Sequence, residues 1–137
     1  MEVYFENEYI TVSYIKELNA VRQEWKEFKV ISFENYQLAF NKSQDLQRIK
    51  KAETFFSDTR KQGIINPEQR KWLLEESLPK AVEIGMKRIV VLAEMSVFKR
   101  YYLNTIMSTI NKVKIPFKIF SDEDKVIQWI KKLDNNL

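Results

Sequence analysis

Residues that could do chemistry gather where one apolar run ends. The pair Phe55–Phe56 is followed directly by hydroxyl and charged side chains, Ser57, Asp58, Thr59 and Arg60. In an open α/β sheet, side chains at the carboxyl ends of parallel strands face the crevice where ligands and partners bind. We therefore take these four residues as a candidate partner-binding or switch surface. We expect Asp58, Thr59 and Arg60 to be exposed there.

A second candidate is an anion-binding site formed by Lys61 and Arg70 together with Arg60. The basic residues flank the start of a helix, where free N–H groups and the helix dipole favour negative charge. Such a site would suit a phosphorylated ligand or an acidic partner. The alternative is that these basic side chains pair with neighbouring carboxylates, namely Asp58 or Glu68.

Several classes of catalytic site are excluded by residue types that the sequence lacks. The chain of 137 residues contains no cysteine and no histidine, so it has no Ser-His-Asp triad, thiolate nucleophile or zinc-cysteine site. Its two glycines cannot build a glycine-rich phosphate loop. We predict a protein without catalytic residues, metal or cofactor. An enzyme that uses carboxylates such as Asp58 and Glu94 is the weaker alternative.

Charge and hydropathy predict a soluble cytoplasmic protein. The 23 basic and 19 acidic residues are interspersed and give a net charge of +4, without the clustered basic face of a nucleic-acid-binding surface. No apolar run approaches the ~20 residues of a membrane span. The amino terminus lacks the basic and long apolar regions of a signal peptide.

The second half of the sequence predicts alternating strands and helices. Residues 87–94 form a β-branched run typical of a strand buried on both faces, and Pro116–Phe120 is a shorter strand. A helix capped by Ser96 separates the two strands, and another follows the capping sequence Ser121–Asp124. In the helix predicted after Ser96, the neighbouring residues Tyr101 and Tyr102 cannot both face the protein core. We therefore consider a homodimer contact there.

Another helix is predicted between Asn66 and Gly85. Asn66 is the expected N-cap, and Gln69 is placed to complete a capping box. Pro79 predicts a kink or break between Ser77 and Pro79, because proline removes a backbone donor and clashes with the preceding turn. Gly85 is the natural C-cap.

The first half of the sequence is less regular. Residues 9–14 alternate as a strand, with residues 3–5 as its partner across a turn at Asn7. Ser32 caps a long helix. The segment Ala20–Phe28 fits a helical period, whereas the turn-forming residue before it favours a strand.

Most of the chain resembles small bacterial STAS-like proteins, which are related in fold to sporulation anti-sigma-factor antagonists and to lipid-binding CRAL-TRIO domains. The resemblance spans roughly Tyr9 to Leu133. It implies that Ala20–Glu27 is the third strand of an amino-terminal antiparallel meander, with Trp25 pointing inward. The residues that carry the resemblance are Asp58-Thr59-Arg60, Asn66-Pro67-Glu68, Trp72-Leu73, Pro79-Lys80-Ala81, Gly85-Met86-Lys87-Arg88-Ile89 and Phe120-Ser121-Asp122-Glu123.

The resemblance also implies a phosphorylation switch. In the antagonists, a serine just after a central strand is phosphorylated by a partner kinase, and the added charge blocks docking. Thr59 is the best positional match here, with Ser57 nearby. The chain departs from that pattern because Arg60 and Lys61 follow where the antagonists have small residues. The alternative is that Asp58 and Thr59 satisfy backbone donors in the loop.

We therefore expect one α/β domain over residues 1–137, a sandwich in which helices pack on a mixed sheet. The sheet would begin as an antiparallel meander and continue as parallel βαβ units. The expected function is a non-enzymatic regulatory or protein-interaction module. The alternative, implied by the CRAL-TRIO relation, is a carrier of a small molecule or lipid. A carrier needs an apolar cavity of several hundred Å³ between sheet and helices, whereas a docking module should be solid there.

Overall fold

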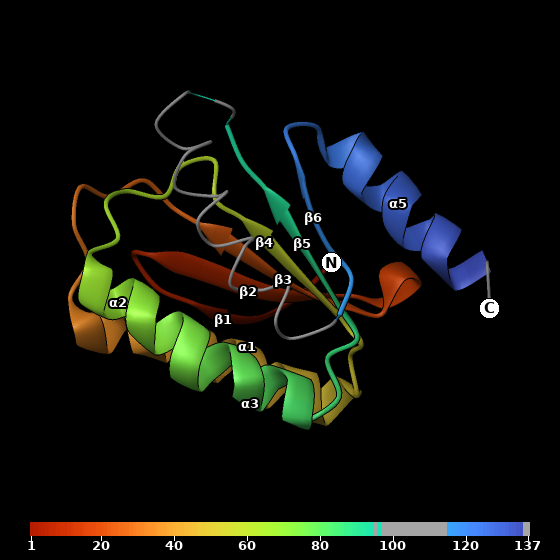
Figure 1. The fold of residues 1–137 in the computed structure, drawn as a ribbon, viewed down its shortest axis with the longest axis horizontal. Coiled ribbons are helices and arrows are strands. Elements are labelled where there is room, and N and C mark those ends of the chain that lie inside the picture. The colour runs from red at the N-terminus through yellow and green to blue at the C-terminus, as the bar shows by residue number, and fades with distance from the viewer. Residues whose placement is uncertain (95, 97–114, 136–137) are drawn as a thin grey trace.

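Six strands form one mixed sheet in the order β1-β2-β3-β4-β5-β6 in the computed structural model, which describes residues 1–94, 96 and 115–135 (Figure 1). The first three strands pair antiparallel, and β3 to β6 pair in parallel. The predicted α/β fold with a mixed sheet is thus confirmed. The strands are β1 (Glu2–Glu6), β2 (Ile10–Ile15), β3 (Ala20–Trp25), β4 (Thr54–Asp58), β5 (Arg88–Leu92) and β6 (Phe117–Phe120).

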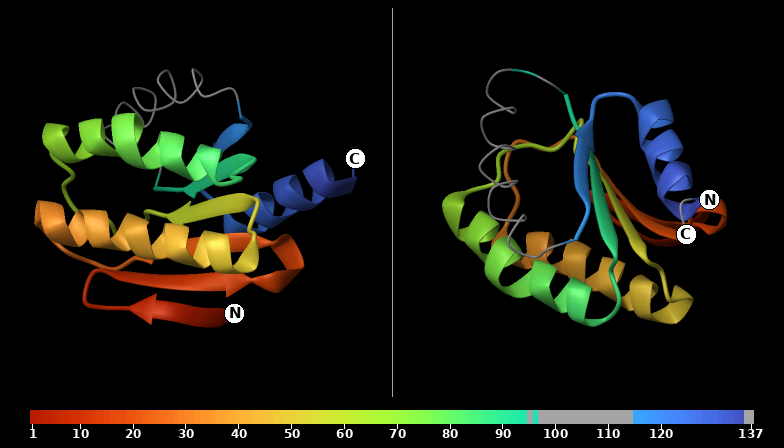
Figure 2. Two further views of the ribbon diagram at one scale, coloured as in Figure 1. Left: turned by 90° about the horizontal axis from the view of Figure 1, so that it is seen from below. Right: turned by 45° about the vertical axis from the view of Figure 1, so that its right-hand side comes forward.

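Helices cover both faces of this sheet (Figure 2). The helices α1, α2 and α3 lie on one face, and α5 lies on the other. A π-helical turn joins α2 to α3, and a 3₁₀ turn joins β2 to β3. The helical segments are α1 (Phe33–Lys50), α2 (Pro67–Trp72), the π turn (Leu73–Ser77), α3 (Leu78–Glu83), α5 (Glu123–Asn135) and the 3₁₀ turn (Lys16–Leu18).

The ambiguous segment after residue 19 is a strand, as the family resemblance implied. Residues Ala20–Trp25 pair antiparallel with Ile10–Ile15. Asn19 adopts the left-handed conformation, with φ 48° and ψ 48°, which asparagine tolerates better than most residues. This conformation ends the 3₁₀ turn and starts β3, which carries Trp25 into the core at 1% exposure.

The N-caps predicted at Ser32 and Asn66 are also present. The Ser32 hydroxyl accepts the backbone N–H of Asn35 at the start of α1. At the start of α2, Asn66 and Gln69 form the complete reciprocal capping box. The C-cap of α3 is Ile84, one residue before the predicted Gly85. Gly85 follows with φ 117°, a conformation that favours glycine.

The effect of Pro79 differs from the prediction of a kink or break between Ser77 and Pro79. The helical path continues through Pro79, and the irregularity is the π turn Leu73–Ser77 that precedes it. The Leu78 N–H donates to the carbonyl of Leu73, five residues back. This wider turn places Pro79 in the first turn of α3, where its missing donor is tolerated.

The helix predicted after Ser96 and the pair Tyr101–Tyr102 lie outside the described residues. Within the part of the chain that is described, no helix is both long enough and apolar enough to cross a membrane.

Side chains along β5 alternate strictly between the two faces. Val90 and Leu92 pack against α5 with Val126 and Ile130, and all four are fully buried. Ile89 and Val91 point to the face covered by α3. A strand with both faces buried is what a continuous apolar run indicates, so this prediction is confirmed.

We predict that Val90→Ala lowers the free energy of unfolding by about 1–3 kcal/mol, through lost burial and a residual cavity. Urea denaturation followed by circular dichroism measures the change. Val3→Ala is the matched control, because Val3 is 59% exposed and should change stability little. A loss at Val90 no larger than the loss at Val3 would show that β5 is not central.

Candidate functional site

A large apolar cavity lies between the sheet and the helices α1, α2 and α3. Its volume is about 940 Å³, within the range of pockets that hold drug-sized ligands. As lined by the described residues, this cavity is open to one side and is not an enclosed interior void. The aromatic and aliphatic side chains that line it include Trp25, Phe40, Phe55, Leu73, Leu78, Met86, Ile89, Val91 and Phe117.

Three polar side chains that line this cavity, Ser57, Gln44 and Ser77, are paired with protein groups. The Ser57 hydroxyl donates to Gln23 Oε1 over 3.2 Å. The Gln44 amide donates to the carbonyl and hydroxyl oxygens of Ser77. Because these groups already form hydrogen bonds with protein atoms, they do not require a polar ligand atom beside them. This part of the cavity therefore suits an apolar ligand.

Buried glutamines tie the helices of this layer together. Gln44 Nε2 on α1 reaches the Ser77 carbonyl at 2.9 Å, and Gln47 Nε2 reaches the Ala81 carbonyl at 2.9 Å. Gln69 Nε2 on α2 donates to the Ile31 carbonyl at 2.8 Å. These bonds fix α1 against the α2–α3 segment directly. The two helical walls are thus held to one another as well as to the sheet.

Two facing loops form one rim of the cavity. Residues Val30 and Ile64 pair as an isolated parallel bridge, and each is 68% exposed. The Ile64 N–H donates to the Lys29 carbonyl at 3.0 Å. Gly63, next to Ile64, packs directly against the facing loop. Only glycine fits there, because a Cβ would lie 1.9 Å from the Phe28 carbonyl oxygen. The rim therefore exposes apolar surface beside the cavity.

The predicted switch residues are divided between the two faces of the sheet. Ser57 and Thr59 line the cavity, whereas Asp58 points to the opposite face, toward α5. Ser57 is 6% exposed and Asp58 is 4% exposed. The expectation that Asp58 is exposed is therefore wrong, because ion pairs and α5 cover it. Thr59 is half-buried, and both its N–H and its hydroxyl donate to the Leu92 carbonyl.

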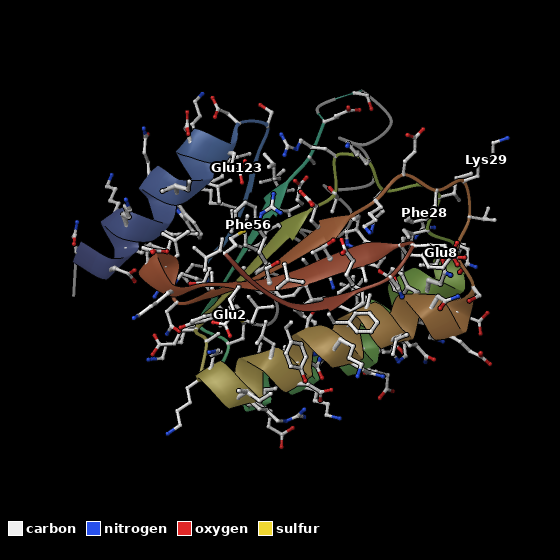
Figure 3. All side chains as sticks on the ribbon, turned by 180° about the vertical axis from the view of Figure 1, so that it is seen from behind. Glu2, Glu8, Phe28, Lys29, Phe56 and Glu123 are labelled. Carbon is white, nitrogen blue, oxygen red and sulfur yellow. The ribbon has the colours of Figure 1, made fainter. Side chains whose placement is uncertain are left out.

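On the α5 face, Asp58 is the centre of a buried ion-pair cluster. Arg60 holds it through two side-chain bonds of 3.0 and 2.8 Å and a backbone bond of 3.2 Å. Arg22 on β3 reaches Asp58 at 3.1 Å, Glu24 at 3.0 Å and Glu123 at 3.4 Å. Figure 3 shows Glu123 at the start of α5, on the same side of the sheet as Phe56. The cluster thus fastens α5 to the carboxyl ends of β3 and β4.

The two arginines set the ionisation of Asp58. Burial raises the pKa of this carboxyl, but hydrogen bonds from the Arg60 side chain and backbone lower it, as do the charges of Arg60 and Arg22. The net effect places the pKa of Asp58 below its ordinary value. The same hydrogen bond raises the pKa of Arg60. Both groups remain charged at neutral pH, which suits structural pairing.

The three basic residues of the predicted anion site lie in different surroundings. Arg60 is committed to Asp58, as the alternative reading held. Lys61 is exposed, and Arg70 is partly buried and lines the cavity. Within the described ranges, no group of three or more acidic side chains is placed to hold a metal ion.

Sequence reasoning missed the buried glutamines. A signal was present, because Phe40, Gln44 and Gln47 recur at helical spacing and share one face of α1. A polar residue that continues an apolar stripe must find a partner inside the protein. Gln23 in β3 is fully buried and accepts from Trp25 Nε1 at 2.9 Å.

No protein-family model, curated protein or solved structure matches the chain. The resemblance to STAS-like proteins therefore stays a prediction. The geometry of the cavity and of the ion-pair cluster carries the functional argument.

We predict that Asp58→Asn lowers the free energy of unfolding at pH 7 by about 3 kcal/mol, because it removes one partner of a buried ion pair. The pKa of Asp58 is lowered by folding. Its contribution is therefore full above the unfolded pKa of about 3.9 and is lost as the pH falls through the folded value. Denaturant titrations between pH 7 and pH 2 should show the two proteins converging in acid.

Asp45→Asn is the control for this change, since the Asp45 carboxylate is about half exposed and pairs with Arg48 in the next turn. It should alter stability by a few tenths of a kcal/mol. A difference between wild type and Asp58→Asn that stays constant over the whole pH range would contradict the electrostatic role.

We predict that Gly63→Ala destabilises the protein by about 1–3 kcal/mol, because the added Cβ forces the Phe28–Val30 segment away. The amide of Ile64 should then exchange its hydrogen faster, since its bond to Lys29 would open. Ile64→Ala, at an exposed position, is the control. Unchanged exchange at residue 64 in Gly63→Ala would mean that the two rim loops are not held as described.

Proposed function

We propose that this protein binds a small apolar molecule in the cavity between the sheet and α1, α2 and α3, and acts as its carrier. The observation that carries the proposal is the cavity of about 940 Å³ with its largely aliphatic and aromatic wall. Burial of an apolar ligand there contributes roughly 25 cal/mol for each Å² removed from water.

The contrast between the two faces of the sheet supports this function. On the α5 face, Phe56, Val90, Leu92, Val126 and Ile130 are packed to 0% exposure. On the other face, Phe55, the residue before Phe56 in β4, is only partly buried and lines the cavity. Among the residues that the structure describes, the apolar space therefore lies on the face covered by α1, α2 and α3.

The regulatory hypothesis has less support from the geometry. A kinase substrate needs an accessible hydroxyl, whereas the Ser57 hydroxyl is buried and bonded to Gln23. The Thr59 hydroxyl is bonded to the Leu92 carbonyl. A phosphorylation switch at either residue stays a prediction drawn from the resemblance.

Ala81→Leu tests the proposal by placing three more carbon atoms in the cavity. Ala81 lines the cavity from α3, and leucine matches alanine closely in helix propensity. We expect wild-type protein to bind the neutral apolar dye N-phenyl-1-naphthylamine with enhanced dye fluorescence. The affinity of Ala81→Leu should be about tenfold weaker, while its free energy of unfolding is equal to or above that of wild type.

Val3→Phe is the matched control, because it adds bulk at an exposed position outside the cavity. It should bind the dye as wild type does. Overpacking of a filled core costs about 1–3 kcal/mol, so such a loss in Ala81→Leu, together with no dye binding by wild type, would overturn the carrier function.

A further inference from the structure

The wall of the cavity divides into an aromatic half and a mainly aliphatic half. Rings from β3, α1 and β4 form the aromatic half, and they include Trp25, Tyr36, Phe40 and Phe55. The other half comes from the α2–α3 segment, from β5 and from the connection between them, with Phe117 on β6 beyond these elements. Its aliphatic members include Leu73, Leu78, Ala81, Met86, Ile89 and Val91. A bound molecule would therefore meet rings on one side and aliphatic groups on the other.

Phe55 lies where the two halves meet. Its side chain packs against the core that contains Phe40 and also against the core that contains Ile89. Strand pairing explains this position, because Phe55 in β4 pairs with Val21 of β3 on one side and with Ile89 of β5 on the other. The ring is only partly buried and lines the cavity. A ligand that lies across both halves would therefore contact it.

The rings behind Phe55 form a connected series. Phe55 is stacked on Phe40, with ring centroids 6.2 Å apart and ring planes at 28°. Phe40 in turn contacts Tyr36 at 5.0 Å and Trp25 at 5.9 Å between centroids. Within the part of the chain that is described, Phe40 is the one ring that Phe55 contacts. The series therefore ends at the cavity, where Phe55 offers a surface for a further ring.

The charged side chains of the wall do not favour an ionised ligand. Lys29 extends outward from the rim (Figure 3), and Arg70 already interacts with another group of the protein. No aspartate or glutamate is found among the described residues that line the cavity. An ionised ligand group would lose its hydration there without gaining a partner of opposite charge. An uncharged ligand avoids this cost.

We infer that the ligand carries an uncharged, planar aromatic ring, which stacks on Phe55 between the aromatic and the aliphatic halves of the cavity. This inference rests on the proposed function and specifies its ligand class. Two stacked rings attract each other beyond the burial of their surface, because each has a negative face and a positive edge. A saturated ring system of the same carbon skeleton also buries apolar surface but lacks this attraction.

Two alcohols that share one carbon skeleton test the inference with the full chain. 1-Naphthol and decahydro-1-naphthol are both uncharged at pH 7, and each competes with N-phenyl-1-naphthylamine. The saturated alcohol has at least as much apolar surface, so burial alone does not favour 1-naphthol. We expect wild-type protein to bind 1-naphthol about fivefold more tightly, as one additional aromatic pair allows. The dye is titrated separately into each variant, since it carries aromatic rings itself.

Phe55→Leu should reduce this affinity ratio to about one, because leucine removes the ring and keeps an apolar side chain on β4. Continued binding of decahydro-1-naphthol by this variant would show that its cavity is retained. Phe120→Leu is the matched control, since Phe120 packs beside Trp129 on the opposite face of the sheet. It should keep the wild-type ratio. Phe117→Leu should also keep it, although Phe117 lines the cavity from β6.

The outcomes separate this inference from the proposed function. Equal affinity of wild-type protein for the two alcohols would overturn the aromatic preference and leave the carrier function standing. A ratio that falls in Phe117→Leu or Phe120→Leu as much as in Phe55→Leu would overturn the assigned position of the ring. Loss of both alcohols from Phe55→Leu would show that Phe55 maintains the cavity instead of binding a ring, and would also overturn the inference. Failure of both alcohols and of the dye to bind wild-type protein would overturn the carrier function itself.

Discussion

The alternation of side chains along the parallel strands β3, β4 and β5 is the constraint on which the rest of the structure depends. Neighbouring residues in a strand point to opposite faces, and the pairing Gln23↔Ser57↔Val91 keeps the faces in register across the sheet. Ser57 therefore meets the cavity, while the next residue, Asp58, meets Arg22 and α5. The polar residues that end β4 thus contribute to two separate sites, the cavity and the ion-pair cluster around Asp58.

Each face holds its helices by different means. On the α5 face, a fully buried apolar layer ends at the charged cluster around Asp58. The Arg22 guanidinium carbon also lies 5.3 Å from the Phe56 ring centroid. On the cavity face, glutamine amides bond to helix carbonyls. The helices on this face need not collapse onto the sheet, because moving them would break the hydrogen bonds of Gln44 and Gln47. An open cavity is therefore compatible with a stable layer.

Local signals in the sequence predicted most elements of the fold. The capping box at Asn66 and the apolar run of β5 each depend on residues close in the sequence, and both were confirmed. The burial of Asp58 was not predictable in this way, because its partner Arg22 is 36 residues away and Glu123 is farther still. The cavity depends on the spacing of whole helices, which periodicity does not encode. The resemblance correctly assigned β3, where periodicity alone favoured a helix.

The proposal that an apolar ligand binds between the sheet and α1, α2 and α3 is tested most directly by locating a bound ligand relative to the two faces of β5. Methyl-labelled protein mixed with unlabelled 1-decanol can report intermolecular nuclear Overhauser effects. Binding in the cavity predicts contacts from the ligand chain to the methyl groups of Ile89 and Val91, which line it, and none to Val90 and Leu92, which are fully buried against α5. Contacts confined to exposed methyl groups such as those of Val3, or the absence of any contact at saturating ligand, would contradict the account.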